Sequence, residues 1–292
     1  MSEWPSIDNR ELLERLAMDD RQFEEFMRAL AASVPARAYD AAAFERAIGY
    51  PWERPRGSFQ LTAAGVEPLE GLGEAERERV VARFVDDHAG RLPVLAIGSN
   101  AAPEALQRKF AHFPEKNDRA VLVLTGRLRD FDVGVAAQPT VYGSMPATLF
   151  PSPGTEVGAA VLWVTTVQFI QLTWSELSYG LGRLRTRFEV DGAATEFDEV
   201  LVFVSRFGTF CPDGSPVAMA AIPAAGRTAL ALTQEQALDA AAALALGPGA
   251  DAEALVRAIF TDMGGLMPKI AATVNRASLP FASERWTPFG GG

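Results

Sequence analysis

The chain has 292 residues, of which 48% are hydrophobic and 22% are charged. This composition is typical of a globular protein and excludes a collagen-like repeat, a coiled coil and a disordered chain. The formal net charge is −10 and the isoelectric point is near 4.9, so the chain has little basic surface for a nucleic-acid backbone. We therefore expect a packed, acidic protein that does not bind nucleic acid.

Cysteine and histidine are scarce in this sequence. The single cysteine, Cys211, cannot form an internal disulfide, and His88 and His112 leave few soft ligands for a transition metal. A metal site built only from carboxylates stays open. The first residues lack the basic start and apolar stretch of a secretory signal, and no apolar run approaches the roughly 18 residues of a membrane span. We expect a cytoplasmic protein with no cofactor and no membrane partner.

Residues 1–90 are expected to form helices separated by loops. One helix has an apolar face at the i, i+3, i+4, i+7 spacing: Phe23, Phe26, Met27 and Leu30. Asp19 and Gln22 are a start signal for this helix. The Pro- and Gly-rich loop 49–73 follows, and its aromatic side chains either pack over a neighbouring core, the preferred interpretation, or bind a ligand. Gly90 is expected to end a second helix with four apolar residues: Val80, Val81, Phe84 and Val85.

The middle of the chain changes to short runs rich in Val, Leu and Phe. We expect seven strands there: Pro93–Ile97, Ala120–Thr125, Leu128–Val135, Ala147–Phe150, Val157–Val164, Leu184–Val190 and Glu199–Ser205. Two of these runs alternate apolar with polar or glycine residues, which predicts a mainly antiparallel sheet or an open barrel. One helix, at about 166–177, interrupts the strands. The predicted fold class is α/β of the mixed α+β kind.

The last part of the chain, 207–292, begins with a loop rich in Pro and Gly. Two Ala-rich helices are expected near Gln234–Leu246 and Ala252–Asp262, and the tail from Ser278 to Gly292 is expected to be extended. This part is expected to pack on the core. We divide the chain into a helical N-terminal extension, a core and a C-terminal extension: 1–90, 91–206 and 207–292.

The first candidate site follows the expected strand 93–97. Gly98, Ser99 and Asn100 form a sharp turn there, and Pro103 suits the first turn of the next helix. Backbone N–H groups in such a turn, next to the positive end of a helix dipole, can hold a carboxylate or a developing oxyanion. A plain helix cap by Ser99 or Asn100 is the competing interpretation.

The second candidate is Glu176, near the end of the expected helix 166–177. It lies one turn from Thr173, and Trp174 and Leu177 flank it, so its carboxylate is expected to be partly buried. A partly desolvated carboxylate suits a general base that acts on an amine. A solvated surface glutamate is the competing interpretation.

Other patterns are less informative. Arg183, Arg185 and Arg187 line one side of an expected strand, where they face either solvent or an anion. The sequence contains neither a P-loop nor a Gly-x-Ser-x-Gly nucleophile elbow. The turn and Glu176 are therefore the main candidates.

Four segments in this order resemble the gamma-glutamylcyclotransferase-like family, over residues 93–205. They are Ile97-Gly98-Ser99-Asn100 at a strand end, a Gly-Arg-Leu sequence within Thr125–Phe131, an Ala-Thr-hydrophobe-Pro sequence within Ala147–Gly158, and the helix that carries Glu176. The family has a Tyr-Gly-Ser-Asn motif at the first place and its catalytic glutamate at the last. The order and spacing of the four segments carry the resemblance.

The resemblance implies an acyltransferase or lyase that forms 5-oxoproline. In this family the free α-amine of a γ-glutamyl compound loses a proton to the glutamate and attacks the γ-carbonyl, which releases 5-oxoproline and an amine without a metal or cofactor. Glu176 would then be the general acid and base, and the segment Ile97–Asn100 would hold the γ-glutamyl group. Arg183 is expected to contribute to the substrate site.

The chain also departs from the family pattern. Ile97 replaces the usual Tyr, Leu177 stands where the family commonly has Gly, and the downstream pocket Tyr is expected to be replaced near Arg183 or Leu184. These departures predict a changed substrate pocket. The alternatives are a non-catalytic member that binds a small metabolite or a protein, and an amidohydrolase or acyl transferase acting in the same pocket. The helical extensions are expected to cover the pocket or to form a homodimer contact.

Overall fold

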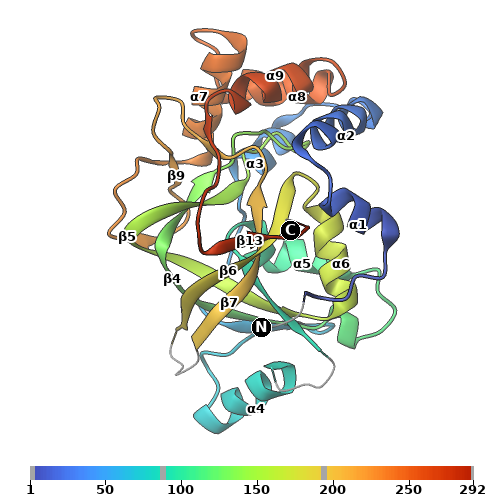
Figure 1. Ribbon diagram of the computed structural model, residues 1–292, viewed down its shortest axis with the longest axis vertical. Coiled ribbons are helices and arrows are strands. Elements are labelled where there is room, and N and C mark those ends of the chain that lie inside the picture. Colours follow the sequence, from blue (N-terminus) through green and yellow to red (C-terminus); the bar gives the residue numbers. More distant parts are fainter. Residues whose placement is uncertain (1–3, 86–89, 192–195, 291–292) are drawn as a thin grey trace.

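The computed structural model describes residues 4–85, 90–191 and 196–290 (Figure 1). Its helices are α1 (Arg10–Leu16), α2 (Asp20–Ser33), α3 (Ala41–Ile48), α4 (Glu74–Val85), α5 (Pro103–Phe110), α6 (Thr166–Ser175), α7 (Gln234–Leu246), α8 (Ala252–Thr261) and α9 (Leu266–Asn275). Its longer strands are β1 (Phe59–Thr62), β2 (Gly65–Pro68), β3 (Leu92–Ala96), β4 (Val121–Val135), β5 (Ala147–Val164), β6 (Tyr179–Val190) and β7 (Glu196–Ser205). The shorter strands are β8 (Thr209–Phe210), β9 (Ala218–Met219), β10 (Ala224–Ala225), β11 (Ala231–Leu232), β12 (Ser278–Leu279) and β13 (Trp286–Pro288).

Five of these strands close into a barrel at the centre of the molecule (Figure 1). β4 pairs with β5, β5 with β3, β7 with β6, and β6 with β4, all antiparallel, whereas β3 and β7 are parallel. The pairing returns to the strand at which it began, so the sheet is closed on itself. The predicted α+β class with a mainly antiparallel sheet is confirmed.

β4 and β5 are longer than the sequence indicated. Each joins two of the expected runs, 120–125 with 128–135 and 147–150 with 157–164. Gly126 does not interrupt β4, because it lies against the backbone oxygen of Glu189 on β6, where a side chain would collide. At Asp130, which has a φ of 64°, the register of β4 against β5 shifts. This bulge increases the local twist of the strand as it bends round the barrel.

Apolar side chains pack on both faces of the barrel strands. One buried cluster joins all five strands in the interior and includes Leu124 and Val202. A second cluster lies outside, where Leu162 packs with Leu12 of α1 and Phe169 of α6. Successive residues of a strand point to opposite faces, so a strand covered on both faces is apolar throughout. This explains the continuous apolar runs that the sequence shows in β3, β4 and β5.

The N-terminal part contains strands as well as the expected helices. Residues 49–73, expected as a loop, include the hairpin β1–β2, and β1 pairs with β4 and so extends the barrel sheet. Phe59 and Leu61 of β1 are buried. The second expected helix is α4, and its expected end at Gly90 follows residues 86–89, which lie outside the described residues.

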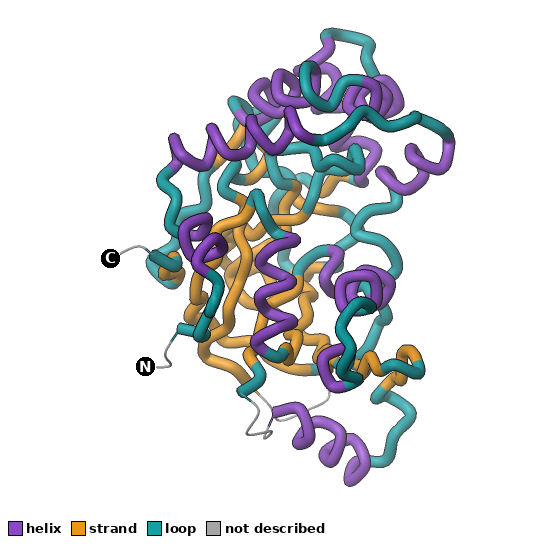
Figure 2. The backbone as a smooth tube through the Cα atoms, turned by 90° about the vertical axis from the view of Figure 1, so that its right-hand side faces the viewer, coloured by secondary structure: helices purple, strands orange, loops and turns teal. Residues whose placement is uncertain are grey.

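Helices from both ends of the chain form a layer over one end of the barrel, at the top of Figures 1 and 2. α2 contacts α9, and α3 contacts α7 and α8. The chain after residue 207 also returns to the sheet, where β13 pairs with β6. α9 was not expected, because Pro268 in its first turn obscures the helical pattern. Within the described residues, none of the helices combines the length and apolarity needed to cross a membrane.

Candidate active site

Glu176 directly follows α6, and its backbone dihedral angles are no longer helical. α6 begins with a capping box, in which the Thr165 side chain accepts from Gln168 N and the Gln168 side chain accepts from Thr165 N. The helix ends at Glu176, whose φ of −108° and ψ of 48° lie outside the helical region. The Glu176 side chain is 16% exposed. Its expected partial burial is therefore present in the structure.

Arg15 of α1 holds the end of α6 in place. Its guanidinium donates to the backbone oxygens of Thr173, at 3.0 Å, and Leu177, at 3.4 Å. Thr173 O belongs to the last turn of α6, where it also accepts from Glu176 N at 3.2 Å, and Leu177 follows the end of the helix. Arg15 is 3% exposed, and burial, with a smaller contribution from Arg206, lowers its pKa to about 10. The conformation at Glu176 is thus fixed from the far N-terminal part of the chain.

The turn 98–100 lies at the end of β3, as the sequence predicted. A side chain at Gly98 would collide with the Tyr50 hydroxyl and the Cβ atom of Ala147, so only glycine fits there. The turn continues as a short 3-10 helix before α5 begins at Pro103. The strand, turn and helix N-terminus expected here are present.

Asn100 joins this turn to Glu176. The Asn100 side-chain amide donates to Glu176 Oε1 at 3.0 Å, and Lys109 Nζ on α5 donates to the same oxygen at 3.2 Å. Lys109 also donates to Asn100 Oδ1, and the Ser175 hydroxyl lies 3.5 Å from Glu176 Oε1. The turn and the carboxylate therefore lie within hydrogen-bond reach of each other, as catalysis by Glu176 requires.

The two oxygens of Glu176 differ in their surroundings. The hydrogen bonds that Glu176 receives from Asn100, Lys109 and Ser175 all go to Oε1, and in the part of the chain that the structure describes Oε2 accepts none. The Lys109 ammonium is a nearby positive charge, and its side chain is 13% exposed. Glu176 is thus anchored through one oxygen, and the other is available to a ligand.

Two buried tyrosines complete the wall beside Glu176. The Tyr50 hydroxyl accepts from Ala147 N at 3.0 Å, and the Tyr179 hydroxyl donates to Ala147 O at 2.7 Å. Burial raises the pKa of both phenols, and the nearby Glu176 carboxylate raises each further. Both tyrosines therefore stay protonated and polar in an otherwise buried wall.

These residues line two adjoining hollows that share Tyr50, Ser99, Glu176 and Tyr179. The inner one has a volume of about 30 Å³ and includes Ile97, Gly98 and Asn100 on its lining. The outer one has a volume of about 320 Å³, the size of a small-ligand site. Its other lining residues are Trp52, Arg108, Lys109, Thr140, Tyr142, Ser144, Pro146, Gln171, Ser175 and Ser178.

The outer hollow has an aromatic and cationic rim. The guanidinium groups of Arg46 and Arg108 lie 4.6 and 5.4 Å from the centre of the Trp52 ring. Arg46 also lies 5.8 Å from the centre of the Tyr142 ring. Such cation–π contacts hold flat rings in fixed positions. The aromatic residues noted in the loop 49–73 therefore both pack and line a pocket.

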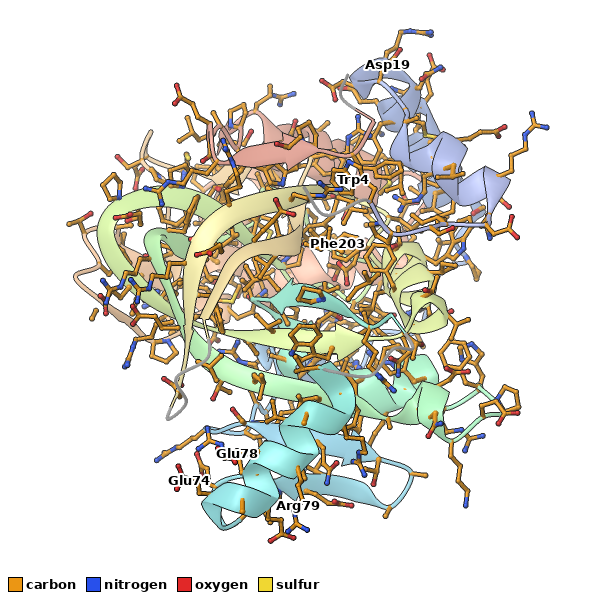
Figure 3. All side chains as sticks on the ribbon, turned by 60° about the horizontal axis from the view of Figure 1, so that its bottom comes forward. Trp4, Asp19, Glu74, Glu78, Arg79 and Phe203 are labelled. Carbon is orange, nitrogen blue, oxygen red and sulfur yellow. The ribbon has the colours of Figure 1, made fainter. Side chains whose placement is uncertain are left out.

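Arg183 lies elsewhere. Its guanidinium stacks 4.3 Å from the centre of the Trp4 ring, which Figure 3 labels, and lies 3.7 Å from Glu199 Oε1. Arg183 is absent from the lining of both hollows at Glu176. The structure thus brings together Ile97, the turn 98–100 and Glu176, and not Arg183.

Sequence reasoning missed Tyr50, Lys109, Arg15 and Tyr179. Tyr179 follows Glu176 by three residues and stands earlier than the position near Arg183 at which a pocket tyrosine was sought. The other three come from segments whose approach to Glu176 depends on the tertiary fold. No group of three or more His, Cys, Asp or Glu side chains suited to a metal ion is found within the described residues.

Comparisons with known proteins give partial matches. No family model matches the chain. A 4-hydroxy-tetrahydrodipicolinate synthase from Methylobacterium radiotolerans is 37% identical over 90 residues, which are 30% of this chain and 29% of that protein. The chain therefore matches less than a third of the length of this curated relative, and its activity is not carried over.

Two solved structures are similar to parts of the chain. A gamma-glutamyl cyclotransferase matches 40% of this chain and 67% of its own, with 19% identity and a TM-score of 0.30. An uncharacterized human protein matches 66% of this chain and 90% of its own, with 13% identity and a TM-score of 0.33. At TM-scores below 0.5 these similarities are too distant to define the activity.

Proposed function

We propose that the chain is an enzyme of the gamma-glutamylcyclotransferase type that converts a γ-glutamyl amide to 5-oxoproline and an amine. One observation carries the proposal: the Glu176 carboxylate is hydrogen-bonded to Asn100 of the turn 98–100 at a hollow of ligand size. The sequence resemblance names these same two segments as the site. The residues Asn100 and Glu176 are 76 positions apart in the sequence, and their hydrogen bond in the structure supports that assignment.

The proposed reaction needs one base and one oxyanion site. Glu176 Oε2 takes a proton from the substrate's α-ammonium group, and the neutral amine attacks the γ-carbonyl carbon. A new C–N bond closes a five-membered ring, and backbone N–H groups of the turn 98–100 stabilise the oxyanion. The proton on Glu176 then passes to the leaving nitrogen and the original amide C–N bond breaks. Glu176 next takes the second proton from the ring nitrogen and passes it to the released amine, so 5-oxoproline and an ammonium product leave.

The intramolecular attack makes proximity the main requirement. The pocket has to hold the γ-glutamyl chain folded, with its amine close to its own γ-carbonyl, and this positioning supplies much of the rate enhancement. Asn100 and Lys109 fix Oε1, so Oε2 keeps one orientation toward the hollow. The reaction uses no redox step, and the proposal therefore needs no cofactor.

Tyr50 bears on the departure at Ile97. The hydroxyl expected from the family's tyrosine is missing at position 97, but the Tyr50 hydroxyl lies against Gly98, the next residue. Tyr179 adds a second hydroxyl on the same wall. Both observations favour a pocket that keeps polar groups for a γ-glutamyl substrate.

The test is the release of 5-oxoproline from a panel of γ-glutamyl amines and γ-glutamyl dipeptides. We expect wild-type protein to form product and Glu176→Gln, which removes the base and keeps the shape, to lose at least about a hundredfold in rate. Glu78→Gln is the matched control, because Glu78 is an exposed residue of α4, at the bottom of Figure 3. Folded wild-type protein that forms no product from any member of the panel would contradict the proposal and favour a binding function.

A further inference from the structure

A larger cavity, of about 780 Å³, lies beside the Glu176 pocket. The two share Tyr50 and Trp52, but Glu176 is absent from the lining of the larger one. Residues with small side chains on β4 and β5 line this cavity. They are Thr125, Gly126, Gly158, Ala159 and Ala160. The segment 220–223 and the start of α7 also line it.

Gln234, the first residue of α7, lines this cavity and lacks hydrogen-bond partners. It is 5% exposed, and both its amide nitrogen and its amide oxygen are buried without a partner in the described structure. A buried polar group left unpaired costs about 1–3 kcal/mol of stability. Gln60 and Gln168, which are also buried, have partners for both amide atoms. Gln234 therefore stands out as a group that a ligand could satisfy.

Arg54 gives the cavity a positive charge. Burial lowers the pKa of its guanidinium, and its long hydrogen bond to Ile97 O, at 3.5 Å, leaves most of its donors unused among the described residues. Burial and the Tyr50 phenol are the influences on this guanidinium, and no carboxylate of the described residues is among them. The other charged residues on the lining are Arg56 and Asp191, and Asp191 lies 4.0 Å from Arg127. The positive end of the α7 dipole adds to the attraction for an anion.

We propose that this cavity binds a small carboxylate that also carries an amide or lactam group. Arg54 binds the carboxylate, and the Gln234 carboxamide pairs with the ligand amide, since each has one N–H donor and one C=O acceptor to exchange. The apolar part of the ligand packs against Ile48, Trp52 and Pro223, which line the cavity and keep accessible surface. The site is distinct from that of Glu176 and needs no chemical step.

The product of the proposed reaction, 5-oxoproline, belongs to this ligand class and is the probe for the site. We expect isothermal titration to detect its binding to the wild-type full chain. Pyrrolidin-2-one lacks the carboxylate and cyclopentanecarboxylate lacks the lactam, so each is expected to bind at least about tenfold more weakly. The measurement involves no turnover, so it succeeds or fails independently of the cyclotransferase activity.

Two variants locate the binding. Gln234→Leu, close in size, is expected to weaken 5-oxoproline binding by about tenfold and to leave or raise the melting temperature, because it removes an unpaired buried amide. Glu176→Gln is expected to bind the probe like wild type. Should Gln234→Leu fail to fold, Arg54→Met is expected to show the same loss of binding.

Three results would overturn the assignment. The first is wild-type protein that binds no 5-oxoproline. The second is binding that Glu176→Gln abolishes and Gln234→Leu leaves intact, which places the ligand at Glu176. The third is a folded Gln234→Leu protein with wild-type affinity or a lowered melting temperature, which gives the amide a structural role.

Discussion

Asp132 and Glu176 are both carboxylates that lie beside a cation, but their contacts differ. Asp132 is 0% exposed, and Arg227 donates to both of its oxygens at 2.7 Å. Glu176 is 16% exposed, and its partners Asn100 and Lys109 both donate to one oxygen. The first pair is sealed inside the protein, whereas the second lines a hollow.

This difference separates a structural carboxylate from one suited to chemistry. In the bidentate pair, Arg227 occupies both oxygens of Asp132, so a ligand could reach this carboxylate only by displacing Arg227. A carboxylate held by one oxygen keeps a fixed position and still has a free oxygen for a proton.

The largest expected effect is on stability, at the sealed pair. Arg227→Met leaves the Asp132 carboxylate buried without its counter-ion, which is expected to destabilise the protein by about 3–5 kcal/mol. Chemical denaturation measures this loss. The control is Arg257→Met, which removes an exposed partner of Glu253 and is expected to cost less than about 1 kcal/mol. Equal stability of the two variants would show that the sealed pair has no structural role.

Lys109→Met tests the contact of Lys109 with Glu176 and is expected to affect activity more than stability. Without the ammonium group, Glu176 keeps only Asn100 as a strong donor, and the carboxylate loses its charge partner. We expect kcat/KM for 5-oxoproline release to fall by about ten- to a hundredfold. The exposed Lys116→Met is the control. A Lys109→Met enzyme with wild-type kcat/KM would remove Lys109 from the site.

Much of the barrel could be predicted from the sequence, since its strands are long apolar runs covered on both faces. The hairpin β1–β2 was harder, because it is short and lies in a segment rich in Pro and Gly. Gly126 in β4 and the Pro- and Gly-containing stretch 151–156 in β5 suggested breaks that the strands do not have. In these places, the contacts of a neighbouring strand decide the local structure, and no local pattern records them.

The candidate site could be predicted only in part, because contacts between distant segments also shape it. Glu176 and the turn 98–100 follow a strand-turn-helix pattern and a helix end, both of which are local features. Tyr50 and Lys109 lie at Glu176, and Arg15 holds the end of α6, only because distant segments of the chain pack together there. The Tyr50 hydroxyl lies against Gly98, the residue after Ile97, and a contact made from so distant a segment leaves no signal in a linear motif.

Arg15→Met is expected to have an intermediate effect on both properties. It removes the Arg15 donor from Leu177 O and leaves Thr173 O with Glu176 N as its donor, at a cost of about 1–3 kcal/mol in stability. The end of α6 then becomes less constrained, and we expect kcat to fall several-fold with little change in KM. Arg21→Met, on the exposed side of α2, is the control. A change confined to stability would restrict Arg15 to a packing role.

The smallest expected effect concerns alkaline pH. Burial raises the pKa of Tyr179 in the folded state, whereas a tyrosine in the unfolded chain has the ordinary pKa of about 10. Above about pH 10 the unfolded chain therefore binds fewer protons than the folded one, so stability falls as the pH rises. Tyr179→Phe is expected to make this fall shallower, by up to about 1.4 kcal/mol per pH unit. The measurement is the free energy of unfolding at several pH values for wild type, Tyr179→Phe and the exposed control Tyr142→Phe. The same dependence of stability on pH in all three proteins would contradict this prediction.

The central claim is that the oxygen of Glu176 left free by Asn100 and Lys109 is the catalytic base. Its most direct test is the first-order rate of 5-oxoproline formation in a single turnover, for wild type and Glu176→Gln. We predict a fall of at least about a hundredfold with an unchanged melting temperature. A Glu176→Gln protein that forms 5-oxoproline at the wild-type rate would contradict the account.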